Sequence, residues 1–311
     1  MRVQTKLLKE VLRSDPADVL DVGGDTPGPM TEMRFWERKS RHLNSLFLQL
    51  QAPRVREMLR ELELLKSTFV VPIAKLCRDI FQARVEANDT YKFMKVLWPW
   101  CEKFEATTDF EELVPLFQPV MHLLLRIWRT SRFYNTPAHL ITIVREFSNA
   151  VIVHAQRYLP GVKIFELVEG DNSAEMVKML LTVLRVCGVF KGCYFDYKAQ
   201  STTECRENPW KMQNAALFTR LDSFLERCHD LRDFATSIVE FSKLAKLEIG
   251  GTKGKTLTMS VQQIHADFGQ AVMKFRAVKY DIMNIDERGF DDDFYTFRTS
   301  VKVLTGVRMY V

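Results

Sequence analysis

Residues 31–50 read TEMRFWERKSRHLNSLFLQL, and this stretch decides the fold class. Thr31 is a favourable N-cap residue, and Glu32 places an acid in the first turn, where the helix dipole favours it. Apolar residues then recur at steps of three and four, the period of one helix face. They are Phe35, Trp36, Leu43, Leu46, Phe47 and Leu50, while Glu37, Arg38, Lys39 and Arg41 fall opposite. The stretch predicts an amphipathic helix that ends near Gln51.

The residues that follow repeat the helical period. Pro53 suits the first position of a second helix, and a third is expected over Val71–Ala87. Asn88-Asp89-Thr90 is a cap signal that predicts a separate fourth helix, which Pro99 should kink or end. These boundaries rest on short local motifs.

Prolines determine the next predicted boundaries. Pro115 and Pro119 should interrupt the fifth helix until Met121, because proline lacks the N–H that a helix interior needs. Thr136 is expected to cap a sixth helix that begins at Pro137.

The second half of the chain is predicted to be helical with one irregular segment, residues 192–208. Its helices are expected over residues 173–188, 209–230, 231–246, 260–278 and 290–310. A short amphipathic helix is also expected at residues 3–12, before a Gly/Pro-rich linker over residues 21–30.

About eleven helices and no convincing alternating strand predict an all-α protein. Because the connectors are short, neighbouring helices should be antiparallel, giving consecutive antiparallel helix bundles that form an elongated rod. The expected divisions are an N-terminal helix and linker at residues 1–30, a first bundle at 31–160 and a second at 161–311.

The composition narrows the classes of partner. The 311 residues include 44 basic and 39 acidic side chains, a balance that gives no reason to expect nucleic acid or an anionic membrane surface. No apolar run reaches the roughly 20 residues that span a bilayer. The six cysteines include no Cys-x-x-Cys pair, so reduced thiols in an intracellular protein are expected rather than a zinc site.

Residues 248–256, EIGGTKGKT, offer an alternative function. Gly254, Lys255 and Thr256 match the end of a P-loop, so nucleotide binding through Lys253, Lys255 and Thr256 is one hypothesis. The spacing opposes it, because the glycine required five positions earlier is Ile249. A helical pattern rather than a strand also precedes the motif.

A structural role for these glycines is the favoured interpretation. Gly250 and Gly251 should end the preceding helix, where a positive φ is cheap only for glycine, and Gly254 should let the chain turn into the next helix.

Other candidate sites fail on residue type or spacing. The six histidines all fall within predicted helices and away from any nucleophile motif, so none is predicted to be catalytic. A calcium loop with Gly289 at its sixth position would put Tyr295 where a bidentate glutamate must bind. The acids at 291–293 are better explained as the first turn of a helix. No catalytic, cofactor-binding or metal-binding residue is therefore predicted.

Several motifs follow one another along the chain. They are Thr26–Met30 with Phe35-Trp36-Glu37-Arg38, then Trp128–Ser131 with Tyr134-Asn135-Thr136, Leu217–Arg227, Leu247–Lys255 and Phe290–Phe294. Their order resembles the tail region of dynein heavy chains. The opening is more similar to axonemal heavy chains, particularly those of outer arms. The family-signature positions are Phe35, Trp36, Arg38, Trp128, Ser131, Tyr134, Asn135, Phe218, Leu221, Asp222, Gly250, Gly251, Lys253 and Gly254.

The resemblance implies a non-catalytic tail segment without cofactors, in the cytoplasm and in the axoneme of a cilium or flagellum. It implies as partners other dynein heavy chains, intermediate and light chains, and docking proteins on doublet microtubules, with no nucleic acid and no membrane. None of the motifs resembles the motor domain of a dynein heavy chain, so a fragment or a shortened tail-like protein is expected. A helical tethering or scaffold protein is the alternative.

Overall fold

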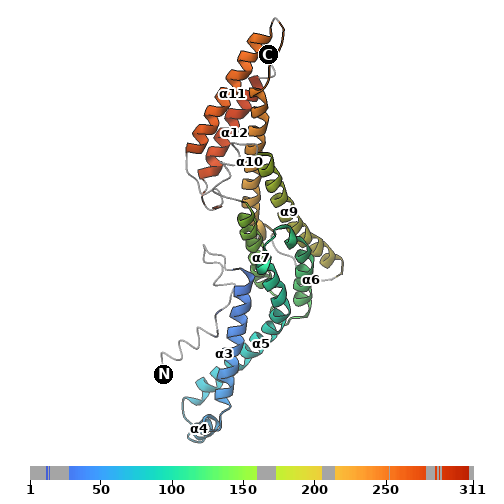
Figure 1. Cartoon of the computed structure of the whole chain (residues 1–311). Coiled ribbons are helices and arrows are strands. Elements are labelled where there is room, and N and C mark those ends of the chain that lie inside the picture. Colours follow the sequence, from blue (N-terminus) through green and yellow to red (C-terminus); the bar gives the residue numbers. More distant parts are fainter. Residues whose placement is uncertain are drawn as a thin grey trace. The chain divides into compact units, whose positions relative to one another are not determined.

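A computed structural model describes residues 12, 14, 28–159, 173–204, 214–251, 253–277, 284, 285, 287 and 289–307. These residues form helices and no strand, which confirms the all-α prediction (Figure 1). The α-helices are α3 (Pro29–Leu50), α4 (Pro53–Leu64), α5 (Val70–Ala106), α6 (Val114–Thr130), α7 (Pro137–Tyr158), α9 (Ser173–Glu204), α10 (Asn214–Ala245), α11 (Gly254–Ala277) and α12 (Gly289–Val307). A 3-10 turn at Glu111–Leu113 precedes α6.

The chain divides into two compact units. The first unit comprises residues 1–108, 112–150 and 190–218, and the second comprises 109–111, 151–189 and 219–311. The division falls inside α7, α9 and α10. The boundaries expected at residues 30 and 160 stay a prediction.

In the first unit α3 packs along α5. The predicted stripe of α3 faces inward, since Trp36 and Leu43 are fully buried. Two details of the prediction for this helix were wrong. The helix begins at Pro29 rather than after Thr31, because Gly28 enters it with a φ of 78°. Lys39 is buried rather than exposed, and its ammonium donates a hydrogen bond of 2.6 Å to the carbonyl of Ser14.

The separate third and fourth helices predicted around Asn88 are one continuous helix, α5. The Asn88 amide oxygen accepts hydrogen bonds from Ser40 (2.7 Å) and Asn44 (2.8 Å) of α3, so it does not cap a new helix. Pro99 lies inside α5 at an exposed position, where water can reach the carbonyl that proline leaves without a partner.

The proline-based prediction for α6 was also wrong, whereas that for α7 is confirmed. The α6 helix begins at Val114, because Pro115 lies in its first turn, where the missing N–H costs nothing. Pro119 lies inside the helix without ending it. At the start of α7, the Thr136 hydroxyl accepts a hydrogen bond of 3.4 Å from the backbone N–H of His139.

Two of the helices of the second half are longer than predicted. The α9 helix continues past Gly188 to Glu204, since Phe190 and Tyr194 are buried beyond the predicted end. The α10 helix runs through the expected break at 230–231 because its apolar residues keep the helical period. Most of the predicted N-terminal helix, most of the 21–30 linker and the expected helix start at Pro209 lie outside the described residues.

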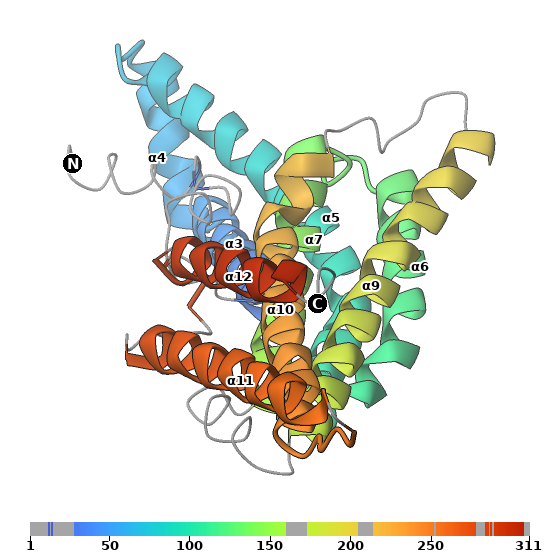
Figure 2. The ribbon, with the colours of Figure 1, turned by 90° about the horizontal axis from the view of Figure 1, so that it is seen from above.

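The helices α11 and α12 lie side by side and next to α10 in the second unit (Figures 1 and 2). Phenylalanine side chains form the core between these helices. Phe241 of α10 stacks on Phe268 of α11 with ring centroids 4.0 Å apart. Phe275 of α11 contacts Phe234 of α10 at 5.3 Å and Phe297 of α12 at 5.4 Å. The α11 helix begins at Gly254 rather than near Ser260. The stretch around Gly250, Gly251 and Gly254, called the glycine loop below, therefore leads directly into a helix of this core.

Candidate interaction surface

One buried carboxylate, Glu32, brings two signature residues together in the first unit. Its Oε1 accepts hydrogen bonds from the Trp36 indole (3.4 Å) and from the Tyr134 hydroxyl (2.8 Å). The His139 ring stacks on Tyr134, with centroids 4.8 Å apart and planes within 6° of parallel. Because Glu32 and Tyr134 are 102 residues apart, this cluster ties the start of α3 to the turn before α7.

Ser131 organises that turn. Its hydroxyl oxygen accepts a hydrogen bond of 2.9 Å from the backbone N–H of Tyr134, while the hydroxyl donates to Asp89 of α5 at 3.2 Å. Serine is well suited to such turns because its short side chain reaches the backbone three residues on. The predicted cap residue Asp89 is therefore used to hold another segment.

The remaining signature positions of the first unit lie outside this cluster. Phe35 is half-buried and contacts the edge of Trp36, and Trp128 is half-buried on α6. Arg38 and Asn135 are exposed. The side chains that the motifs share therefore serve different purposes, and only some of them pack in the core.

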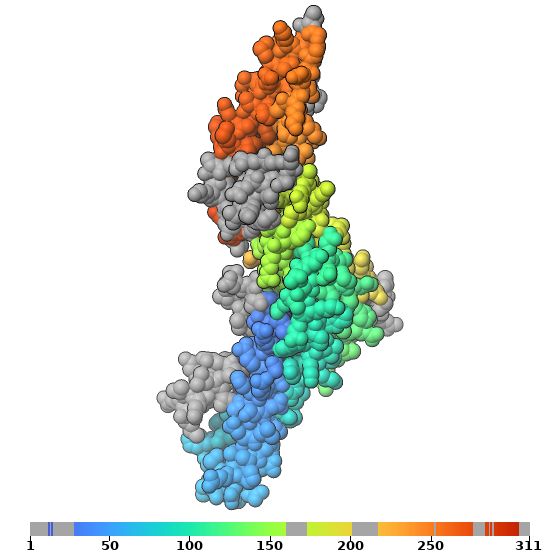
Figure 3. All heavy atoms as spheres, viewed as in Figure 1, coloured from blue at the N-terminus to red at the C-terminus, as the bar shows by residue number. Residues whose placement is uncertain are grey.

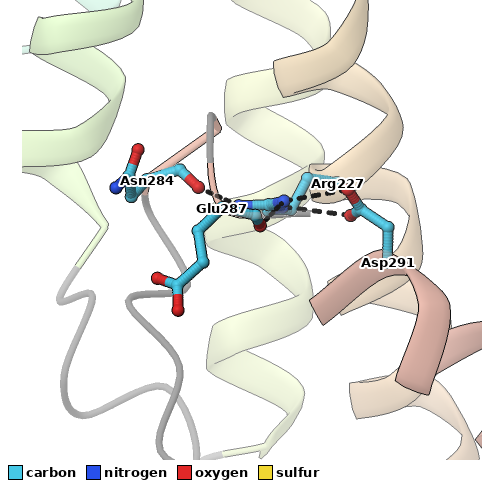
Figure 4. A network of polar contacts seen from close by, with 4 residues as sticks. All are labelled: Arg227, Asn284, Glu287 and Asp291. Carbon is cyan, nitrogen blue, oxygen red and sulfur yellow. Dashed lines mark hydrogen bonds and ion pairs between the residues drawn. The ribbon is translucent and has the colours of Figure 1, made fainter. Parts of the chain in front are cut away.

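In the second unit the buried guanidinium of Arg227 joins α10 to the residues around the start of α12 (Figure 4). Its Nε and Nη2 donate to the two carboxylate oxygens of Asp291 at 3.2 and 3.0 Å. It also donates to the backbone carbonyls of Asn284 and, at 2.8 Å, of Glu287. The Phe290 ring lies 5.2 Å from the guanidinium carbon.

The role of Arg227 was not predicted, although it ends the signature Leu217–Arg227. A signal was present, because Arg227 comes three residues after Phe224 and four before Leu231, both buried on the same stripe. A charged residue on an apolar stripe needs a buried partner. Of the other α10 signature positions, Phe218 and Leu221 are buried and Asp222 is exposed.

The glycine loop confirms part of the structural interpretation. Gly251 has a φ of 96°, which favours glycine, whereas Gly250 has no positive φ and open space around it. A Cβ on Gly254 would lie 2.1 Å from the carbonyl oxygen of Ile249, so no larger residue fits at the first position of α11. Lys253 is exposed beside this contact.

The P-loop hypothesis does not survive this geometry. A P-loop connects a buried strand to a helix, whereas the helix α10 precedes this loop. Lys255 and Thr256 are exposed in the first turn of α11.

Buried thiols offer no reactive site. The five cysteines among the described residues form no disulfide. Burial raises the pKa of Cys187 to about 12, and it also raises the pKa of Cys101 and of Cys228. Because the thiolate is the reactive form, these groups are poor nucleophiles at neutral pH.

Exposed apolar side chains gather on the hairpin of α3, α4 and α5, whose atoms form the light-blue surface at the lower end of Figure 3. None of the 12 residues of α4 is buried. We define the tip residues as Leu48, Met58, Leu64, Leu65, Phe69 and Val71, each between 51% and 78% exposed. Exposed apolar residues gathered in this way are typical of protein–protein contact surfaces.

Comparison with known proteins decides the family. Residues 4–306 match the family described as Dynein heavy chain, N-terminal region 1. The chain belongs to this family. This dynein heavy-chain segment is 43% identical over 300 residues to "Dynein beta chain, flagellar outer arm" of Chlamydomonas reinhardtii, which covers 96% of the segment and 6% of that relative.

Two further relatives have names that place them in a cilium or an axoneme. The segment is 31% identical to "Dynein beta chain, ciliary" of Tripneustes gratilla and 29% identical to "Dynein axonemal heavy chain 17" of Mus musculus. Each alignment covers 96% of the segment and 7% of the relative. The resemblance predicted from the order of the motifs is thereby confirmed, and the segment corresponds to an N-terminal tail region of axonemal-type heavy chains.

Two features are absent from the part of the chain that the structure describes. No helix there is long and apolar enough to cross a membrane. In the same part of the chain, no three histidine, cysteine or acidic side chains are arranged to hold a metal ion.

Proposed function

We propose that this chain is a non-catalytic structural segment of an axonemal dynein heavy-chain tail, which supports assembly of the dynein complex and its anchoring on the doublet microtubule. The observation that carries the proposal is the family match over residues 4–306. The flagellar, ciliary and axonemal relatives support a place in the axoneme. Consecutive bundles forming a rod would suit such a tail.

The use of the signature residues supports a structural role. Trp36, Tyr134 and Arg227 are buried and hold helices together instead of lining an open cleft. The outward faces of the bundles are then available for other heavy chains, intermediate and light chains, and docking proteins. Among these faces, the surface formed by the tip residues carries several highly exposed large apolar side chains, including Leu64 and Leu65.

An assembly experiment tests the proposal. The full chain is mixed with dynein subunits extracted from axonemes and recovered by co-precipitation, with crosslinking mass spectrometry of the bound fraction. We expect dynein subunits to be recovered and crosslinks to lie on exposed faces. A variant with Leu64→Glu and Leu65→Glu should recover fewer subunits, because charge at 78% and 77% exposed positions weakens apolar contact without disturbing the core.

A matched control with Glu61→Gln and Glu63→Gln changes the same helix but leaves its apolar side chains in place. Circular dichroism checks that both variants keep their helix content. Failure of the unaltered chain to recover any dynein subunit would contradict an assembly role. Robust Mg²⁺-dependent ATP hydrolysis by the purified chain would contradict a non-catalytic one.

A further inference from the structure

Acidic side chains from two helices face one another across a pocket of about 300 Å³ in the second unit. Glu226 and Asp230 come from α10, and Asp291 and Asp292 come from α12. Arg298 of α12 is the cation in the lining, which is completed by Ser223, Ile285, Phe294 and Tyr295. Asp291 is also the residue that binds the buried Arg227.

Asp230 is the group in this pocket whose charge is costly. Burial raises its pKa from 3.8 to about 6, and Arg298 opposes that rise. Glu226, Asp291 and Asp233 add to it by repulsion between like charges. The acids Glu226 and Asp233 of α10 and Asp291 of α12 therefore disfavour the charged form of Asp230, whereas Arg298 favours it.

We propose that the contact between α10 and α12 is a pH-sensitive device, in which protonation of Asp230 docks α12 more firmly on α10 and keeps the Arg227–Asp291 pair closed. A neutral Asp230 no longer repels Asp291, so the carboxylate of Asp291 stays with the guanidinium. This inference does not depend on the proposed function.

The direction of the pH dependence follows from the raised pKa of Asp230. An acid whose pKa is higher when α12 is docked binds its proton more tightly in the docked state, so docking strengthens as pH falls through 6. If the undocked value is the ordinary one of 3.8, the docking equilibrium constant rises about fourfold between pH 7.5 and 5.5. Solvent screening of a half-exposed carboxylate makes this value an upper bound.

Amide hydrogen exchange in the full chain measures the effect. After correction for the intrinsic dependence of exchange on pH, protection of the α12 amides should rise by up to about fourfold from pH 7.5 to 5.5. The variant Asp230→Asn, which mimics the protonated acid, should show the high protection at every pH. The control Glu240→Gln removes an exposed acid of α10 outside the pocket and should keep the dependence.

A second pair of measurements tests the charges around Asp230. Arg298→Gln should move the midpoint of the protection profile to higher pH, because the arginine favours the charged carboxylate. Carbon NMR of the unaltered chain should show the Asp230 carboxyl titrating near pH 6, which needs no variant to fold. Protection of α12 that is independent of pH, or an Asp230 titration near pH 4, would overturn the proposal.

Discussion

Each unit buries a charged side chain that joins helices distant in the sequence, Glu32 in the first and Arg227 in the second, but the partners differ. In the first unit the Glu32 carboxylate accepts hydrogen bonds from the neutral donors Trp36 and Tyr134. In the second unit the Arg227 guanidinium binds the Asp291 carboxylate and two backbone carbonyls. In the first arrangement uncharged aromatic donors bind the buried charge, whereas in the second an opposite charge binds it, and that charge responds to nearby acids. In the second unit, the nearby acids are therefore expected to link this contact to pH.

The largest expected effect is that of removing the guanidinium. Arg227→Met should lower the free energy of unfolding of the second unit by about 3 kcal/mol, because it leaves two carbonyls and one carboxylate without their donor. Urea denaturation followed by circular dichroism measures the loss. The control Arg232→Gln breaks a half-exposed pair with Asp233 on the same helix and should cost less than about 1 kcal/mol. If the two variants lose the same free energy of unfolding, the buried arginine contributes no more stability than the exposed one, which would contradict this prediction.

A backbone constraint tests the second unit independently of charge. Gly254→Ala should lower the free energy of unfolding by about 2 kcal/mol, because its Cβ would lie 2.1 Å from the Ile249 carbonyl oxygen. Gly251→Val should cost on the order of 1 kcal/mol or more, because φ is 96° there. Gly250→Ala, with nothing within 4 Å, is the matched control. Thermal melting gives the melting temperature of each variant. A Gly250 variant that melts as low as the other two would show that the φ of Gly251 and the close approach at Gly254 are not what makes those positions sensitive.

The smallest effect sharpens the account of the first unit. Tyr134→Phe should cost about 1.5 kcal/mol, because Glu32 loses a buried hydrogen bond of 2.8 Å while the ring stack on His139 is kept. The matched control Tyr295→Phe removes the hydroxyl of an exposed tyrosine, 74% accessible, and should be nearly neutral. Urea denaturation at pH 5.5 and 7.5 gives both values. If Tyr134→Phe leaves the chain as stable as the control does, the Glu32 cluster contributes less than its burial implies.

Local signals predicted much of the fold. The stripe of Trp36 and Leu43 was placed on the buried face, and Thr136 was identified as a cap. A positive φ was expected at Gly250 and Gly251, and it occurs at Gly251 but not at Gly250. What was missed involved single side chains with remote partners, namely Asn88, Lys39 and Arg227. Their residue types are common on solvated helix faces, so no pattern within a few positions distinguishes them.

The family, the all-helical class and most helix faces follow from the amino-acid sequence by itself, because period, caps and motif order depend on residues within a few positions of one another. Only the tertiary structure decided that α5 continues through Asn88, whose partners lie 44 and 48 residues away. It alone joined the Leu217–Arg227 and Phe290–Phe294 motifs through one ion pair across 64 residues. The physical reason is the same in each case: a polar group that loses water on burial must find its partner in space, and that partner can come from any part of the chain.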